Sequence, residues 1–168
     1  MGYRLVVLDV DGTIWDYPKT SSVLPEPIKL GHDYFSAADG TTVRLREGIR
    51  DFLEACRQNG IYVSLASWND PELPTRALKG LGLMGYFSHP KIEPHPYKDL
   101  MLKEIYADFT KEGVTILPKE TVFIDDREIM VERVRSAFPD VLGLVYGVDF
   151  FSYFALKEIL ISKKYWPT

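Results

Sequence analysis

Short apolar runs recur along the chain and alternate with segments whose apolar residues return every three or four positions. The uninterrupted runs cover 5–8, 61–66, 121–124 and 141–146. Runs of this length and composition are typical of strands that are buried on both faces of a parallel sheet. A further short strand is predicted at 86–88.

The intervening segments have helical periodicity. In the first of them, Ile49, Phe52, Leu53 and Cys56 share one face, and Asn59-Gly60 is typical of a helix stop. Helices are predicted at 47–59, 72–79, 97–109, 127–137 and 151–162. Alternating strands and helices predict an α/β fold with a parallel sheet, in which functional sites lie outside the carboxyl ends of the strands.

The segment 14–46 breaks this alternation. It is rich in proline, and two β-prone stretches at 33–36 and 41–44 flank Ala38-Asp39-Gly40, which predicts a hairpin. We find no repeat, low-complexity tract or interdomain linker, so a single domain over 1–168 is expected.

Composition narrows the classes of protein. The net charge of −4, with both signs mixed along the chain, argues against nucleic-acid binding through a basic surface. No apolar run is long enough to span a membrane, and the N-terminus lacks the pattern of a signal peptide. The single cysteine, Cys56, excludes an internal disulfide. A cytoplasmic protein that binds neither membrane nor nucleic acid is therefore expected.

Carboxylates follow two of the predicted strands. Asp9 and Asp11 come directly after 5–8, and Asp125-Asp126 come directly after 121–124. Residues two apart at a strand end point the same way, so Asp9 and Asp11 are expected at one mouth of the sheet. Several carboxylates at one sheet edge repel one another unless a cation is near, and Mg²⁺ suits such an all-oxygen site. Asp126 also fits a helix N-cap.

Two further segments can complete an anion site. Ser67 follows 61–66, and its hydroxyl with the backbone N–H groups after it can hold phosphate oxygens. Lys98 opens a predicted helix and can supply a positive charge. Trp68 is either a substrate wall or a packing residue. Asn69 is either a helix N-cap or a residue that orients Lys98 or the substrate.

Together these residues resemble a known family. The order Asp9-x-Asp11-Gly12-Thr13, Ser67, Lys98, Asp125-Asp126 resembles the four motifs of the haloacid dehalogenase (HAD) superfamily. The stretches 11–15, 39–41 and 123–127 resemble its magnesium-dependent phosphatase branch, which lacks a large cap domain. The resemblance implies a HAD-like Rossmannoid fold, with a three-layer, doubly wound parallel sheet and a small β-hairpin flap. Trp68, Asn69 and Arg127 depart from the residues usual in that branch.

The resemblance also implies a mechanism. Asp9 is the nucleophile that forms an aspartyl-phosphate, and Asp11 is the general acid and base. The resemblance implies that Mg²⁺ is held by Asp9, the backbone carbonyl of Asp11 and Asp125, with Asp126 close by or acting through water. Ser67 and Lys98 hold phosphoryl oxygens. The implied substrates are protein phosphotyrosine, sugar phosphates or small metabolite phosphates.

Three alternatives stay open at this point. A receiver-like switch also uses acidic groups, a hydroxyl residue and a lysine, although its phosphorylated aspartate lies mid-chain, where this chain has Ser67. A non-catalytic binding protein could keep the fold. A phosphotransferase differs from a hydrolase only in the access of water to the phospho-aspartate. The sequence does not indicate an oligomeric state.

Overall fold

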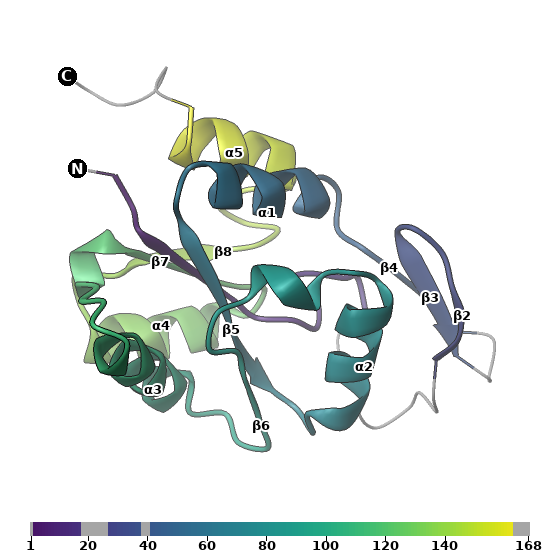
Figure 1. Ribbon diagram of the computed structural model, residues 1–168, viewed down its shortest axis with the longest axis horizontal. Coiled ribbons are helices and arrows are strands. Elements are labelled where there is room, and N and C mark those ends of the chain that lie inside the picture. The colour runs from purple at the N-terminus through teal and green to yellow at the C-terminus, as the bar shows by residue number, and fades with distance from the viewer. Residues whose placement is uncertain (1, 18–26, 38–40, 163–168) are drawn as a thin grey trace.

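A five-stranded parallel sheet forms the centre of the molecule (Figure 1). The computed structural model describes residues 2–17, 27–37 and 41–162. The strands lie in the order β6-β5-β1-β7-β8. Their bounds are β1 Leu5–Leu8, β5 Tyr62–Trp68, β6 Lys91–Glu93, β7 Thr121–Asp125 and β8 Leu142–Val145. The first strand in the chain is thus the central strand of the sheet, which places the residue after it at the middle of the carboxyl edge.

Helices cover both faces of this sheet, which confirms the three-layer, doubly wound α/β fold (Figure 1). One face carries α1 (Ile49–Gln58) and α5 (Tyr153–Leu160), with α2 (Glu72–Gly80) packed into the same core. The other face carries α3 (Lys98–Lys111) and α4 (Glu128–Ala137). Two short 3₁₀ turns lie at Met84–Tyr86 and Pro118–Glu120.

The alternation of side chains along β1 separates two hydrophobic cores. Leu5 and Val7 pack with α3 and α4, whereas Val6 and Leu8 pack with α1 and α5. All four side chains are buried, as expected for a strand covered on both sides. The uninterrupted apolar run in the sequence is the direct consequence of this double burial.

A small antiparallel sheet is inserted between β1 and α1. Its strands are β2 (Pro27–Leu30), β3 (Tyr34–Ala37) and β4 (Thr42–Arg44), in that order. The pairing of β3 with β4 confirms the predicted hairpin, and its expected turn at 38–40 lies outside the described residues. The strand β2 was not predicted. Apart from these three strands, the described residues between β1 and α1 form no folded domain that could serve as a large cap.

This small sheet is tied to the loop that follows β1. The Phe35 ring packs edge-on against Trp15, with ring centroids 5.1 Å apart. The Leu45 N–H donates to the Asp33 carbonyl at 2.8 Å, and Trp15 and Leu45 form an isolated β-bridge. The small antiparallel sheet therefore packs against the loop after β1, which contains Asp11.

Two predictions about the edge of the main sheet need correction. Residues 86–88 do not form a strand, because Met84–Tyr86 is a 3₁₀ turn and Phe87 makes only an isolated bridge to Val63. The edge strand is β6, whose alternating charged and apolar residues suit a sheet edge but give no apolar run. Its pairing with 66–68 extends β5 two residues beyond the predicted end, so Ser67 lies within the strand.

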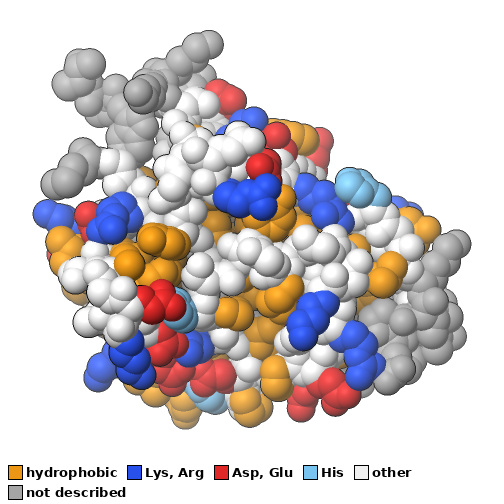
Figure 2. Space-filling model, in the orientation of Figure 1, with side chains coloured by type: hydrophobic (Ala, Val, Ile, Leu, Met, Phe, Trp, Pro, Cys, Tyr) orange, Lys and Arg blue, Asp and Glu red, His pale blue; other side chains and the backbone are white. Residues whose placement is uncertain are grey.

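The surface agrees with the mixed charge of the sequence. Figure 2 shows basic and acidic side chains interspersed on one face of the molecule. None of the described helices combines the length and apolar character that crossing a bilayer requires.

Candidate active site

The candidate site lies at the carboxyl ends of the three middle strands. Asp9 follows β1, Ser67 and Trp68 end β5, and Asp125 ends β7. The Asp9 N–H donates to the carbonyl of Ile124 at 2.9 Å, which continues the ladder between β1 and β7 past the last strand residue. In a parallel sheet the carboxyl ends of all strands meet at one edge, so residues far apart in the chain converge here.

A tight turn follows Asp9. The N–H groups of Thr13 and Ile14 both donate to the Val10 carbonyl, at 3.1 and 2.8 Å. Gly12 has φ +79°, and a Cβ at this position would lie 2.3 Å from Oδ2 of Asp126. Glycine is therefore required here by both the backbone conformation and the close approach of a carboxylate.

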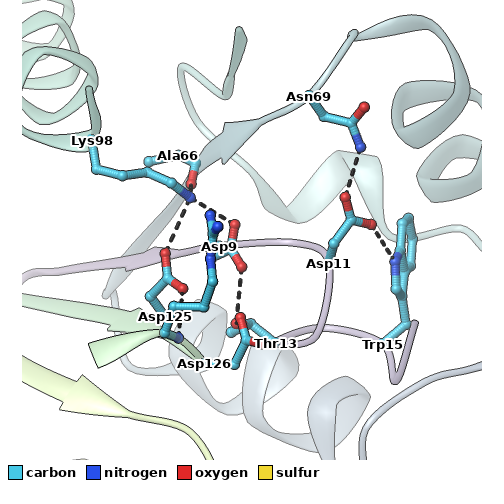
Figure 3. A network of polar contacts seen from close by, with 10 residues as sticks. Asp9, Asp11, Thr13, Trp15, Ala66, Asn69, Lys98, Asp125 and Asp126 are labelled. Carbon is cyan, nitrogen blue, oxygen red and sulfur yellow. Dashed lines mark hydrogen bonds and ion pairs between the residues drawn. The ribbon is translucent and has the colours of Figure 1, made fainter. Parts of the chain in front are cut away.

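Three carboxylates gather beneath this turn (Figure 3). Asp9, Asp125 and Asp126 each offer an oxygen, and these oxygens all lie within 4.8 Å of one another. Asp9 and Asp125 are buried, with 4% and 0% exposure, and Asp126 is partly buried. The Thr13 hydroxyl lies 3.2 Å from Oδ2 of Asp9 and 3.3 Å from Oδ1 of Asp126. With a single proton, that hydroxyl donates to one of them at a time.

One buried lysine faces this acidic group. The Lys98 ammonium lies 2.7 Å from Oδ1 of Asp9, 3.2 Å from Oδ2 of Asp125 and 2.5 Å from the carbonyl of Ala66. The Lys98 side chain is completely buried. Its position at the first residue of α3 brings it under the edge of the sheet, on the face that Leu5 and Val7 also occupy.

The electrostatic balance of this group favours bound cations. Burial alone lowers the pKa of Lys98, but the charges of Asp9 and Asp125 outweigh burial and raise that pKa overall. Burial and the charge of Asp9 raise the pKa of Asp125 to about 7, and the same two causes raise the pKa of Asp126. The Lys98 ammonium contacts two of the three carboxylates, so the negative charge of the group is incompletely compensated.

The Asp11 carboxylate is not one of the three. Its Oδ1 accepts a hydrogen bond from the Trp15 indole at 2.8 Å, and its Oδ2 accepts one from the Asn69 amide at 2.6 Å. Figure 3 shows Asp11 turned toward these two donors and away from the Asp125 side of the site. The chain leaves the strand conformation after Leu8, so the two-residue alternation no longer aligns Asp9 with Asp11.

The end of β5 supplies groups of two kinds. Ser67 is 1% exposed, and its hydroxyl has no hydrogen-bond partner among the described residues. An unpaired buried hydroxyl is costly, which points to a missing partner. Trp68 is 47% exposed, and the Arg127 guanidinium lies 5.6 Å from the centre of its ring.

The acidic group fits a divalent cation. The buried Oδ2 of Asp125 contacts the Lys98 ammonium at 3.2 Å but lacks the geometry of a hydrogen bond to any described group. Carboxylate oxygens at this spacing match the preference of Mg²⁺ for a few carboxylates, with water and phosphate completing the shell. Asp9, Asp125 and Asp126 are the side chains that could hold the ion.

Three other residues contact the loop after β1. Trp15 lies four residues after Asp11, and only the structure shows that its N–H faces that carboxylate. The Arg46 guanidinium donates to the Gly12 carbonyl at 2.9 Å, and the Tyr153 hydroxyl donates to the Thr13 carbonyl at 2.9 Å. These two donors, from distant segments, fix the backbone of the loop. No local pattern in the sequence identifies them.

Among known proteins, matches to this chain were found only among solved structures. No family profile matches the chain, and no curated protein matches it. A HAD-superfamily hydrolase from Ehrlichia chaffeensis matches with a TM-score of 0.63 and 17% identity, over 95% of this chain and 97% of that protein. A HAD-superfamily hydrolase, subfamily IA, variant 1, from Geobacter sulfurreducens matches with a TM-score of 0.62 and 17% identity, over 95% and 100%.

A third structure covers part of a longer protein. It is the N-terminal part of a Bacteroides fragilis protein, containing a phosphatase domain complexed with Mg. The TM-score is 0.60 at 16% identity, and the match covers 92% of this chain but only 39% of that one. At these identities the likeness concerns the fold, and the chain has the fold of HAD-superfamily hydrolases.

Proposed function

We propose that this chain is a magnesium-dependent phosphomonoester hydrolase in which Asp9 is the nucleophile. One observation carries the proposal: at the carboxyl edge of the sheet three carboxylates have oxygens within 4.8 Å of one another, and two of them, Asp9 and Asp125, contact the completely buried Lys98. The cost of gathering these carboxylates is hard to explain without a cation, and the unpaired buried hydroxyl of Ser67 suits an anionic ligand. The phosphatase domain with Mg in the Bacteroides protein supports the same chemistry by analogy of fold.

Asp9, Asp125 and Asp126 would hold the ion, together with the backbone carbonyl of Asp11. When bound, Mg²⁺ supplies positive charge that neutralises phosphoryl oxygens and keeps the carboxylates ionised. Lys98, hydrogen-bonded to Oδ1 of Asp9, holds this carboxylate in one orientation and leaves Oδ2 as the attacking atom. Thr13 contacts the same Oδ2 through a weak hydrogen bond of 3.2 Å.

The reaction proceeds in two displacements. Oδ2 of Asp9 attacks phosphorus, the bond from phosphorus to the ester oxygen breaks, and Asp11 gives its proton to that leaving oxygen. Water then attacks the phosphorus of the aspartyl-phosphate, Asp11 takes a proton from this water, and the bond to Asp9 breaks to release phosphate. The two steps return Asp9 to its ionised form and Asp11 to its protonated form.

Neighbouring groups have defined tasks in this scheme. The unpaired hydroxyl of Ser67 would donate to a phosphoryl oxygen, which supplies the partner that it lacks. Asn69 and Trp15 hold the carboxylate of Asp11 by its two oxygens. Asp11 must turn from this position toward the leaving oxygen, so Asn69 and Trp15 set its starting orientation.

The substrate class is a phosphate monoester. Phosphotyrosine in proteins, sugar phosphates and small metabolite phosphates all fit a site whose rim includes the half-exposed Trp68 and whose described surroundings contain no large cap. The Geobacter and Ehrlichia hydrolases share the fold and leave the substrate of this chain open.

The test is a phosphate-release screen over many phosphate monoesters, run with and without magnesium. Repeated turnover that depends on magnesium and disappears in Asp9→Asn is expected. A receiver-like switch would take up or release only one phosphoryl group per chain, and a non-catalytic binder would release none. A phosphotransferase would pass the group to an added alcohol in preference to water. Any of these three results contradicts the proposal.

A further inference from the structure

An arginine and a tryptophan meet above the acidic group. Trp68 ends β5, and Arg127 follows β7 by two residues. These strands lie on either side of β1, so their backbones are two strand spacings, about 10 Å, apart. The guanidinium of Arg127 nevertheless lies 5.6 Å from the centre of the Trp68 ring. The two side chains therefore reach toward each other across the end of β1, where Asp9 is located.

The pair belongs to the outer layer of the site. Arg127 is exposed and Trp68 is 47% exposed, whereas Asp9, Ser67 and Lys98 beneath them are buried. Arg127 is close in sequence to two carboxylates, yet it forms no ion pair with any described residue. Its backbone N–H donates to Oδ1 of Asp125 at 2.9 Å, which fixes the start of the side chain relative to the acidic group.

Under the proposed function, other groups would match the charges beneath this pair. A divalent cation and the Lys98 ammonium would together balance the three carboxylates, and Ser67 and Lys98 would face the phosphoryl group. The Arg127 guanidinium makes no hydrogen bond or ion pair with a described residue, and with Trp68 it lies at the exposed rim of the site. A planar guanidinium with free donors recognises carboxylate or phosphate oxygens in pairs, and an aromatic face keeps it oriented.

We propose that Arg127, supported by Trp68, determines substrate specificity by binding a second anionic group on the leaving part of a small phosphate ester. This inference rests on the proposed phosphatase function. An exposed contact between an arginine and an aromatic ring contributes little to stability, so the pair can separate to admit a substrate without disturbing the fold. The guanidinium then exchanges a solvent-exposed contact for a charge-assisted one.

The test uses two matched esters, 4-carboxyphenyl phosphate and its neutral analogue 4-carbamoylphenyl phosphate. The measured quantity is the ratio of kcat/KM for the anionic ester to kcat/KM for the neutral one. In Arg127→Gln this ratio should fall by about ten-fold, the value of one charge-assisted hydrogen bond. Trp68→Ala should lower it in the same direction, because the guanidinium loses its support.

Arg133→Gln is the matched control. It removes the same charge from another arginine of the region after β7, one that packs on the Tyr97 ring at 5.3 Å, and should leave the ratio as it is in the unaltered chain. Turnover of both esters with the same ratio in the unaltered chain and in Arg127→Gln overturns this inference while the phosphatase function stands. Absence of magnesium-dependent turnover of every ester refutes the proposed function itself.

Discussion

The carboxylates in the two halves of the site have different kinds of partner. Around Asp9, three carboxylates lie close together while the Lys98 ammonium contacts two of them, Asp9 and Asp125, so the group is short of positive charge. Around Asp11, a single carboxylate receives two neutral N–H donors, from Trp15 and Asn69, and each of its oxygens has a partner. We call these the charged half and the neutral half of the site.

The difference separates two physical tasks. The charged half is not satisfied by its own residues, so it is arranged to bind a cation and an anion, and its energy depends on them. In the neutral half both oxygens of the Asp11 carboxylate have donors without a ligand, so Asp11 can be held as an acid or base in a fixed starting orientation. The stability of variants in the charged half should therefore depend on added magnesium. The stability of variants in the neutral half should not.

The largest effect is expected from the nucleophile. Asp9→Asn keeps the shape of the side chain but removes the attacking charge, so magnesium-dependent turnover should fall by roughly 1,000-fold or more. Phosphate release measures the loss, and far-UV circular dichroism checks that the chain stays folded. Asp140→Asn, at an exposed carboxylate in the turn between α4 and β8, is the control with ordinary turnover. Turnover retained in Asp9→Asn would mean that another residue is the nucleophile.

The next largest effect is expected from the Lys98 ammonium of the charged half. Lys98→Met keeps the volume but leaves Asp9 and Asp125 buried without their ammonium, so the free energy of unfolding should fall by about 3 kcal/mol without magnesium. Added magnesium should restore a large part of the loss. Urea denaturation with and without the ion measures both values. Lys103→Met, exposed on the same helix, should change neither, and an equal loss in both variants would contradict the role given to Lys98.

The charged half should also respond to pH. The pKa of Asp125 in the folded chain, about 7, lies above its ordinary value of 3.8. Its contribution to stability is therefore fully present below the ordinary pKa, and it is lost as the pH rises toward the folded pKa. Magnesium binds the ionised carboxylates, so the rise in Tm that it causes should be about 5 °C near pH 8 and much smaller near pH 5.

Thermal unfolding in buffers of equal ionic strength tests this dependence. Asp125→Asn should reduce the rise in Tm at the higher pH, since it removes one of the three ligands. A magnesium effect that is equal at both pH values would show that the ion binds elsewhere.

The charged half was more accessible to prediction than the neutral half. Asp9 directly follows one buried apolar strand and Asp125 ends another, and strands of that kind specify both the sheet and the edge at which their ends meet. The orientation of Asp11 was not accessible, because it depends on a turn at Val10 that ends the strand alternation. The edge strand β6 was also missed, since its pairing with β5 is a tertiary contact and its charged residues hide it.

The contacts of Arg46 and Tyr153 show the same limit. Each donates to a carbonyl of the loop after β1, from segments 34 and 140 residues away in the chain. A side-chain donor to a backbone carbonyl cannot be predicted from the local periodicity of the sequence or from the type of residue. Such contacts follow from packing of whole elements, which a single sequence does not display.

The smallest expected effect tests the neutral half. Trp15→Phe keeps the aromatic packing against Phe35 but removes the indole N–H that Asp11 accepts at 2.8 Å. The free energy of unfolding should fall by about 2 kcal/mol, because Asp11 loses a donor and the smaller ring fills the buried site less well, and magnesium should not restore it. Trp68→Phe, at a half-exposed ring, is the matched control and should leave the free energy of unfolding unchanged. If magnesium rescues Trp15→Phe as it rescues Lys98→Met, the two halves are one electrostatic unit, because the loss of a neutral donor would then be felt by the bound cation.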